Sequence, residues 1–585
     1  MIKQVLIILI SFTSLLLFSQ EKKPYDYSMD LGLPIKIDMI LAGNFCEMRR
    51  NHFHTGIDIK TNKKEGYRLY AIEDGYISRI KISPWGYGKA IYVSYNNGLT
   101  SVFAHCSRFP PLLDSLIYTI QKNQESAIID ENILPLKIPV KRGEIIAYSG
   151  NSGASSAPHL HFELRETKTE HAINPLLFEC YKKEITDNTP PEIRGLKLYA
   201  ITKNGYMIPG QSLYFQVKRE GEKFVVNNNK TINIDTLFTE NSQLGIGLYA
   251  IDKLDGAYNN CGIYSSELIQ NDTQIHSQEI NFMDFDVSRY LNTHKDYFAF
   301  KHLKQHIHKQ FTNDINPLPI YPNNNGYISW NRVKADYQLI SKDVHGNQSE
   351  LSFKLEKTKK KASKNQFEQK EYYYPNQINT INLIGFEAII EQGQFYEPAE
   401  KIVSAKPSTN KNLLSDTYQL FEYQTPVQSG INMRIEIPKK YKALPKQKMG
   451  IVLIDNRNRL YFQGGYPEDN WITHKIRHFG HFALAIDTIP PVIKALDYKK
   501  NQNISKYSTL EFNLSDNLSG LSSYKAYLNG KWVLAYYNRK QKRYIIPLNT
   551  RSKIHLVNGK NVLKIKAIDK MKNVSEQTIT LIYQQ

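Results

Sequence analysis

The stretch PHLHFE at residues 158–163 decides the fold of the N-terminal part of this chain of 585 residues. Apolar and polar residues alternate through it, which is typical of a β-strand with one buried face. Residues two apart in a strand point to the same side, so His159 and His161 project together while Leu160 and Phe162 enter a core. Two adjacent imidazoles on one face are either surface histidines or part of a metal site.

Two other motifs favour the metal site. HTGID at residues 54–58 places His54 four residues before Asp58, and FAH at residues 103–105 ends a predicted strand on His105. Imidazole nitrogens and a carboxylate oxygen are ligands that zinc accepts, and a catalytic zinc site uses three of them and leaves one position for water. Four histidines and one aspartate exceed that need, so two histidines remain to handle protons, which suits hydrolysis.

The sequence around these motifs predicts a mainly β domain. Short alternating runs, such as residues 76–80 and 90–95, are separated by Gly- and Pro-containing turns. This pattern extends over residues 21–185 and is typical of an antiparallel β fold rich in hairpins.

Seven segments of this region occur in the order found in lysostaphin-type (M23, or LytM) metallopeptidases, and residues 38–175 resemble that family. The segments are NHFHTGIDI at 51–59, YAIEDGYI at 70–77, GYGK at 86–89, FAH at 103–105, VKRGEII at 140–146, SGNSG at 149–153 and PHLHFE at 158–163. The resemblance implies a metallopeptidase with an antiparallel β catalytic domain and one Zn²⁺ ion.

The resemblance also implies a role for each candidate residue. Position by position, it makes His54, Asp58 and His161 the zinc ligands. The remaining pair, His105 and His159, would act as the general base and stabilise the transition state, with the division of roles left open.

Three features near the motifs add alternatives. His52 is a rival ligand, but it lacks the four-residue spacing from His54 to Asp58 that the family shows. Glu163 shares a face with the paired histidines and is expected either to support them or to have a structural role at the strand edge. Residues 110–139 are a long stretch between motifs, expected to form a helix or loop along one side of the cleft.

Further histidines form two looser groups. Neither has a carboxylate at ligand-like spacing, and both are interpreted as solvated helical faces. The groups are His302, His306 and His308, and His474, His478 and His481.

The beginning of the chain predicts export. Lys3 precedes an apolar block at residues 5–18, and polar residues follow, so residues 1–20 are interpreted as a signal peptide, with no transmembrane segment after its cleavage. The formal net charge of +19 favours an anionic partner. Nucleic acid fits poorly with export, whereas peptidoglycan fits a periplasmic or envelope-associated protein.

Two phrases recur about 300 residues apart and indicate an internal repeat. DNTPPEI at 187–193 returns as DTIPPVI at 487–493, and D-x-x-x-N-x-S occurs at 343–349 and at 569–575. We interpret the two copies as immunoglobulin-like β-sandwiches. The predicted domains after residue 185 are an Ig-like sandwich at 186–357 with an insertion near 256–325, a basic linker at 358–367, a β-rich domain of uncertain type at 368–486 and a second Ig-like sandwich at 487–585.

The four cysteines carry no recognisable pattern. Their spacing matches no zinc knuckle, and both disulfides and buried free thiols stay open. They are Cys46, Cys106, Cys180 and Cys261.

Together these features predict an exported zinc endopeptidase that hydrolyses stem or cross-link peptide bonds in peptidoglycan. The alternatives are a catalytically silent LytM-type activator or scaffold of other wall hydrolases, and an endopeptidase of a surface protein. The Ig-like domains could bind an envelope protein partner. The bond that is cut, autoinhibition by residues 110–139 or by the C-terminal domains, and the oligomeric state are left open.

Overall fold

The computed structural model describes residues 25–134, 138–227, 231–237, 242–322, 325–329, 334–357, 371–422 and 425–584. The predicted leader and basic linker lie outside these residues. The described chain is mainly β, as the sequence predicts, and forms four units at residues 25–185, 186–357, 371–486 and 487–584. Within the described residues, no helix is long and apolar enough to span a membrane.

The first unit is built on an antiparallel sheet in the order β1-β2-β10-β6-β5-β4-β7, with β8 beside β4 and β11 beside β10. Its elements are β1 Leu41–Gly43, β2 Ile57–Lys60, β3 Arg68–Tyr70, β4 Gly75–Ile82, β5 Lys89–Tyr95, β6 Leu99–Ala104, α1 Pro111–Gln124, β7 Ile129–Asn132, β8 Ile138–Val140, β9 Ile145–Tyr148, β10 His159–Glu166, β11 Ala172–Ile173 and α2 Glu179–Glu184. Leu160 and Phe162 on β10 are fully buried, as the alternation predicts.

The three motif-bearing segments lie at the centre of this sheet. β10 is paired with β2 on one side and β6 on the other, so His161 is opposite Asp58 across one strand boundary and Ala104 across the other. His105 follows β6 directly. The sheet therefore brings together motifs that are about a hundred residues apart in sequence.

The long stretch between the motifs forms a helix and a strand. Helix α1 begins with Pro111 in its first turn, where a missing N–H costs nothing, and packs Leu113 and Ile117 inward. It ends at Glu125, which takes the left-handed conformation common at helix ends. Strand β7 then joins the sheet beside β4.

The second unit is a ten-stranded assembly in the order β18-β17-β21-β22-β14-β13-β12-β16-β20, with β15 beside β22. Its elements are β12 Glu192–Ile201, β13 Met207–Glu220, β14 Lys223–Val226, β15 Thr231–Asn233, β16 Gln243–Ile251, β17 Ser265–Gln270, β18 Thr273–Glu279, β19 Phe282–Met283, α3 Leu291–His294, β20 Ile307–Lys309, β21 Lys334–Lys342 and β22 Gln348–Glu356.

The predicted insertion near residues 256–325 has two parts. Strands β17, β18 and β20 extend the sheet of the second unit, whereas β19, α3 and residues 318–320 pack on the first unit. β19 pairs with β11 and continues the central sheet of the first unit across the domain boundary. The two units therefore share both a sheet and a hydrophobic core.

The third unit contains two five-stranded sheets around one core, with a short β23–β26 pair beside them. Its strands are β23 Tyr372–Tyr373, β24 Asn379–Leu383, β25 Phe386–Ile390, β26 Ala399–Glu400, β27 Val403–Lys406, β28 Thr417–Leu420, β29 Ile431–Glu436, β30 Met449–Ile454, β31 Leu460–Gly464, β32 Tyr466–Glu468, β33 Trp471–Ile476 and β34 Gly480–Ile486.

The fourth unit packs a four-stranded sheet on a five-stranded sheet. Its elements are β35 Val492–Ala495, β36 Gln502–Asn503, β37 Thr509–Ser515, β38 Leu521–Leu528, β39 Lys531–Val533, β40 Tyr536–Asn538, β41 Arg543–Pro547, α4 Thr550–Lys553, β42 Gly559–Asp569 and β43 Val574–Tyr583.

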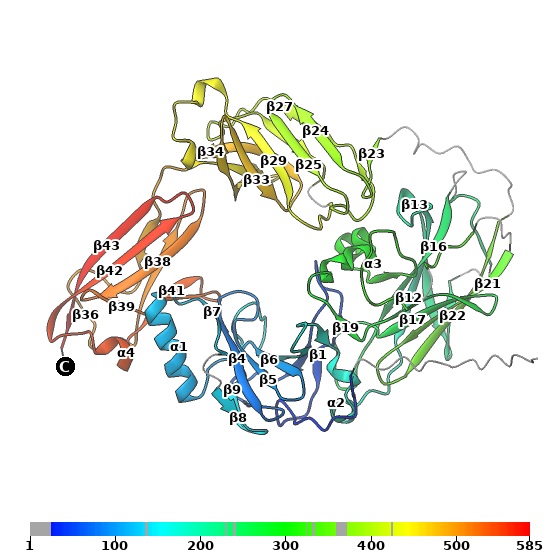
Figure 1. Ribbon diagram of the computed structural model, residues 1–585, viewed down its shortest axis with the longest axis horizontal. Helices are drawn as coiled ribbons and strands as arrows, with labels where there is room; N and C mark the ends of the chain where they lie inside the picture. Colours follow the sequence, from blue (N-terminus) through cyan, green and yellow to red (C-terminus); the bar gives the residue numbers. More distant parts are fainter. Residues whose placement is uncertain are drawn as a thin grey trace, which may run out of the picture.

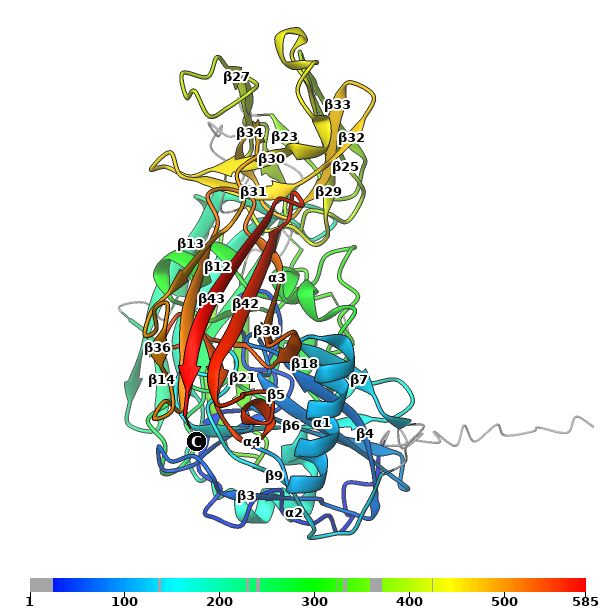
Figure 2. The same cartoon turned by 90° about the vertical axis from the view of Figure 1, so that its left-hand side faces the viewer.

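The four units are arranged in a ring that brings the end of the chain back to the first unit (Figure 1). In the perpendicular view, α4 of the fourth unit again lies beside α1 (Figure 2). The contact includes an ion pair between Arg551 and Asp114, with a 2.7 Å separation. The fourth unit also contacts the first beyond α1, because Tyr537 packs near Trp85 and Arg539 donates to the Gly153 carbonyl oxygen at 3.3 Å. The ring is therefore closed by α1 together with these loop contacts.

The cysteines resolve one open question. All four are free thiols in this structure, and Cys46, Cys106 and Cys261 are buried. They contribute to cores and not to cross-links.

Candidate metal centre

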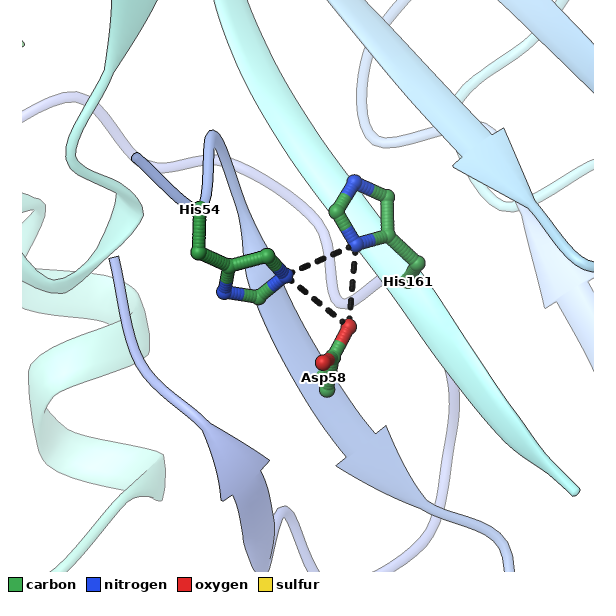
Figure 3. Close-up of side chains that lie close together, drawn as sticks. All are labelled: His54, Asp58 and His161. Carbon is green, nitrogen blue, oxygen red and sulfur yellow. Dashed lines mark hydrogen bonds and ion pairs between the residues drawn. The ribbon is translucent and has the colours of Figure 1, made fainter. Parts of the chain in front are cut away.

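Three side chains from β10, β2 and the turn before β2 converge on one point (Figure 3). His54 Nε2 lies 3.2 Å from Asp58 Oδ1 and 3.0 Å from His161 Nδ1, and His161 Nδ1 lies 2.9 Å from Asp58 Oδ1. These separations approach the edge of a tetrahedron with metal–ligand bonds of about 2.0–2.1 Å, which is about 3.3–3.4 Å long.

The backbone before β2 must approach β10 closely to make this convergence possible. A Cβ atom on Gly56 would lie 2.4 Å from the carbonyl oxygen of Phe162, so only glycine fits there. Gly56 therefore lets the His54–Asp58 segment lie directly against the strand that carries His161.

The ring nitrogens that point away from the convergence are held by oxygen acceptors. His54 Nδ1 lies 2.7 Å from the carbonyl oxygen of Asn44, and His161 Nε2 lies 2.8 Å from Glu163 Oε1. An oxygen acceptor places the proton on the nitrogen that faces it, so in the neutral rings the lone pairs point to the common centre. Metal-binding histidines are oriented in this way.

Glu163 is the centre of a buried polar network. Its carboxylate accepts hydrogen bonds from Thr55 Oγ1 at 2.8 Å and from the Tyr87 hydroxyl, and pairs with Arg165 at 2.6 Å. Burial alone would raise the pKa of Glu163, but Arg165 and His161 outweigh it and hold that pKa well below its usual range. Of the two roles expected for Glu163, the contacts match the support of His161.

The other two predicted site residues lie against this group. The rings of His105 and His159 are 4.7 Å apart, and His159 Nε2 lies 3.5 Å from Asp58 Oδ1. His105 Nδ1 lies 2.9 Å from the Ser152 carbonyl oxygen, and His105 has a left-handed backbone with φ 59°. The structure thus brings together all five side chains that the sequence selected.

The electrostatics divide the histidines into two kinds. Burial would lower the pKa of His161, but its hydrogen bonds to Asp58 and Glu163 prevail and raise it to about 9. Burial, together with the nearby His161 and His159, lowers the pKa of His105 to about 3. The centre therefore attracts a cation at His161 and keeps His105 neutral.

The donor set fits a bound metal of the zinc class. Two imidazole nitrogens and one carboxylate oxygen are borderline ligands of the type that zinc binds with three protein donors. The two rings are held by the Asn44 carbonyl oxygen and the Glu163 carboxylate, and the carboxylates of Asp58 and Glu163 attract positive charge to the site. His52 is exposed and is not part of the group.

The structure corrects the interpretation of the other histidines. His308 is buried on β20, with its Nδ1 2.9 Å from His294 Nε2, while His474 and His481 lie on β33 and β34. The predicted solvated helical faces are therefore wrong for these three residues. In the described part of the chain, neither histidine group gathers three metal-donor side chains.

Some residues that shape the centre carried no signal in the sequence. Asn44 holds His54 through its backbone carbonyl, and Lys295 of the second unit donates from Nζ to the carbonyl oxygens of Arg49 and Arg50, both at 2.8 Å. Lys295 is about 250 residues from its acceptors in the chain, so local patterns could not predict the contact.

Comparisons with known proteins match two parts of the chain. Residues 135–175 match the family described as Peptidase family M23, and residues 370–487 match the family described as Zu5-like domain. The second match covers the unit whose type the sequence left uncertain.

Individual relatives match part of the chain. The DD-carboxypeptidase/endopeptidase Mpg of Neisseria gonorrhoeae is 32% identical over 133 residues, which are 23% of this chain and 24% of Mpg. An uncharacterized metalloprotease of Haemophilus influenzae is 28% identical over 123 residues, which are 21% of this chain and 20% of the relative. The chain thus spans about a quarter or less of these relatives' length.

Among solved structures, the catalytic domain of lysostaphin from Staphylococcus simulans is 23% identical, with 24% of this chain and 91% of that chain covered and a TM-score of 0.18. From the motifs in family order, the match of residues 135–175 to Peptidase family M23 and the similarity to Mpg, the first unit of this chain is an M23-type domain.

Proposed function

We propose that this protein is an exported zinc endopeptidase that hydrolyses peptide bonds in bacterial peptidoglycan. The observation that carries the proposal is the convergence of His54, Asp58 and His161, with His105 and His159 beside them. Three protein donors leave room for the water that hydrolysis consumes.

A zinc ion held by these three side chains would activate water and polarise the scissile carbonyl group. The protein's own groups supply the proton transfers. Because Nδ1 of His105 faces the Ser152 carbonyl oxygen, the neutral ring carries its proton there and keeps Nε2 free to accept another. Nδ1 of His159 is likewise 2.8 Å from the Ala157 carbonyl oxygen, so its Nε2 is also the basic atom.

The outer residues keep this arrangement rigid. Glu163 fixes the ring of His161, and the Asn44 carbonyl fixes the ring of His54. Fixed rings hold reacting atoms in place during the reaction, which lowers the entropic cost of reaching the transition state. Either His105 or His159 can then deliver the proton that the leaving amine requires.

The choice of substrate rests on two further arguments. The Neisseria relative is named as a DD-carboxypeptidase/endopeptidase, an activity directed at the D-amino acid stems of the wall. The net charge of +19 favours an acidic polymer over a neutral one. Both support peptidoglycan, and the apolar N-terminal block supports export to reach it.

The decisive experiment compares wild type with His161→Ala on purified sacculi and analyses the products by mass spectrometry. Wild type is expected to contain zinc and to release peptide-cleaved muropeptides, and His161→Ala to lose activity by roughly 10²-fold or more, since it removes a ligand outright. His52→Ala is the matched control, because His52 lies two residues from His54 but outside the centre.

Three outcomes would contradict the proposal. A wild-type protein without metal and without wall products would favour the non-catalytic activator. Cleavage of envelope proteins but not of sacculi would favour a surface-protein endopeptidase. Equal loss in His52→Ala and His161→Ala would show that the effect is not specific to the centre.

A further inference from the structure

A second group of potential metal donors lies where the second unit begins. Asp187, Asp252 and Asp343 come from three separate segments, yet each offers a carboxylate oxygen within 4.8 Å of the others. All three residues are more than nine-tenths buried, with 6%, 2% and 3% of their surface exposed. Three buried carboxylates at this distance repel one another strongly unless a positive charge lies between them.

Two oxygens of this group lack a hydrogen-bond donor. Among the described residues, nothing donates to Asp187 Oδ2 or to Asp252 Oδ1, although both atoms are buried. Buried polar atoms are nearly always paired in folded proteins, so these oxygens indicate a missing positive partner.

The fourth unit provides an internal comparison. Asp487, Asp516 and Asp569 occupy the same positions of the repeat and also come within 4.8 Å. There the backbone supplies two donors, because Ser519 N donates to Asp487 Oδ2 at 2.9 Å and Gly520 N donates to Asp516 Oδ2 at 2.7 Å. Among the described residues, Asp516 Oδ1 lacks a donor, as Asp252 Oδ1 does, so the two groups differ at the entry aspartate.

The corresponding loops explain the difference. The sequence DNLSG at 516–520 aligns with DKLDG at 252–256, so Asp255 replaces Ser519. The Asp255 side chain instead accepts hydrogen bonds from Asn188 N at 3.2 Å and Thr189 Oγ1 at 2.7 Å. Asp255 also has a backbone N–H, but it does not donate to Asp187 Oδ2, which lacks the donor that Asp487 Oδ2 receives from Ser519.

We propose that Asp187, Asp252 and Asp343 bind one divalent cation of the oxygen-preferring class, Ca²⁺, separately from the peptidase centre. Carboxylate oxygens are the ligands that Ca²⁺ prefers, and it accepts six to eight of them with water completing the shell. The group contains no imidazole or thiolate donor, which zinc would favour.

This cation would also support the peptidase centre through a short chain of contacts. Asp252 and Cys261 exchange backbone hydrogen bonds of 2.9 and 2.8 Å. The next residue, Gly262, bonds the Asn44 side chain through its N–H at 2.9 Å and its carbonyl at 2.6 Å. The backbone carbonyl of Asn44 in turn orients His54. By holding Asp252 at the end of β16, the cation would therefore stabilise the contacts that position Asn44.

The test measures Ca²⁺ binding to the full-length protein after treatment with a chelator and reloading with zinc. Titration calorimetry is expected to show one Ca²⁺ per chain in wild type and in His161→Ala, weaker binding of Mg²⁺, and a higher melting temperature with Ca²⁺. Asp252→Asn is expected to abolish both the binding and the shift in melting temperature, while the matched Asp516→Asn of the fourth unit keeps both.

The absence of Ca²⁺ binding in wild type would overturn the proposal, as would Ca²⁺ binding that survives in Asp252→Asn. A stable Asp252→Asn protein whose melting temperature already equals that of Ca²⁺-loaded wild type, combined with no Ca²⁺ binding in wild type, would show that a proton fills the role. If Asp252→Asn does not fold, as judged by circular dichroism, the number of Ca²⁺ ions bound per chain decides: one in both wild type and Asp516→Asn supports the proposal, and none in wild type overturns it. None of these measurements depends on peptidase activity.

Discussion

The second and fourth units carry the same two short sequence motifs, yet they contact the first unit in different ways. Both keep the same framework, in which an asparagine side chain donates to the backbone carbonyl of the entry aspartate at 3.0 Å; the pairs are Asn347 with Asp187 and Asn573 with Asp487. The second unit shares a sheet and a core with the peptidase domain, whereas the fourth touches α1 mainly through side chains at the surface.

The nature of the contacts sets what each unit can do. Around the second unit, Phe53 and Met283 pack in one core, and Lys295 is fully buried beneath the segment that leads to His54. At the fourth unit, the Arg551–Asp114 pair is partly exposed, and such pairs contribute about 0–1 kcal/mol. The second unit is therefore joined to the first through a shared sheet and core, while the fourth is docked on it through surface contacts.

The largest expected effect comes from cutting between the units. A fragment of residues 21–185 would expose the apolar side chains that the second unit covers, so we expect it to aggregate or to bind zinc poorly. A fragment of residues 21–357 is expected to fold and to bind zinc like the full chain. Size-exclusion chromatography and zinc titration check both, and a well-folded, zinc-binding shorter fragment would contradict the comparison.

A smaller effect is expected from Asn44→Ala, which removes both hydrogen bonds to Gly262. Loss of such an outer contact typically weakens metal binding by about 10–100-fold. Competition with a zinc chelator measures the change. Arg551→Ala, at the interface of the fourth unit with α1, is the control and should leave the affinity for zinc unchanged. If both variants bound zinc equally weakly, the two interfaces would not differ in their effect on the metal centre.

The buried lysine makes a pH-dependent prediction. Burial, with a contribution from Arg50, lowers the pKa of Lys295 from 10.5 to about 7. Between about pH 7 and pH 10.5 the unfolded chain binds more protons than the folded chain. The free energy of unfolding should therefore rise with pH in this range, by up to about 1.4 kcal/mol per pH unit, and should stay level outside it. Denaturant unfolding from pH 6 to pH 10 should show this slope in wild type and not in Lys295→Met.

The smallest effect is expected at the closure of the ring. In about 1 M salt, where charges are screened beyond about 3 Å, or in Arg551→Ala, the fourth unit should separate from α1 more often. Fluorescence energy transfer between labels on α1 and α4 would report the separation. Peptidase activity on a small soluble peptide should stay within about twofold, because these surface pairs are worth about 0–1 kcal/mol. A large change in activity would show that the fourth unit is more than docked.

The strands and the five central side chains could be predicted because their signals are local. Alternation places His159 and His161 on one face, and the family order of short motifs points to His54, Asp58 and His105. The support from Asn44, Gly262 and Lys295 could not be predicted, because it joins segments about 200 residues or more apart through single polar contacts. The helical spacing of His474 and His481 was a poor guide, since a seven-residue interval also fits two consecutive strands, which here belong to different sheets.

The backbone of His105 affects how its chemistry can be studied. At φ 59° most side chains crowd the neighbouring carbonyl group, at a cost of roughly 1–2 kcal/mol, whereas glycine and asparagine tolerate the conformation. Alanine would keep the Cβ and its crowding, whereas glycine would remove both and free the backbone as well. Asparagine removes the imidazole and tolerates this backbone conformation, which makes it the informative replacement for separating proton transfer from the shape of the turn.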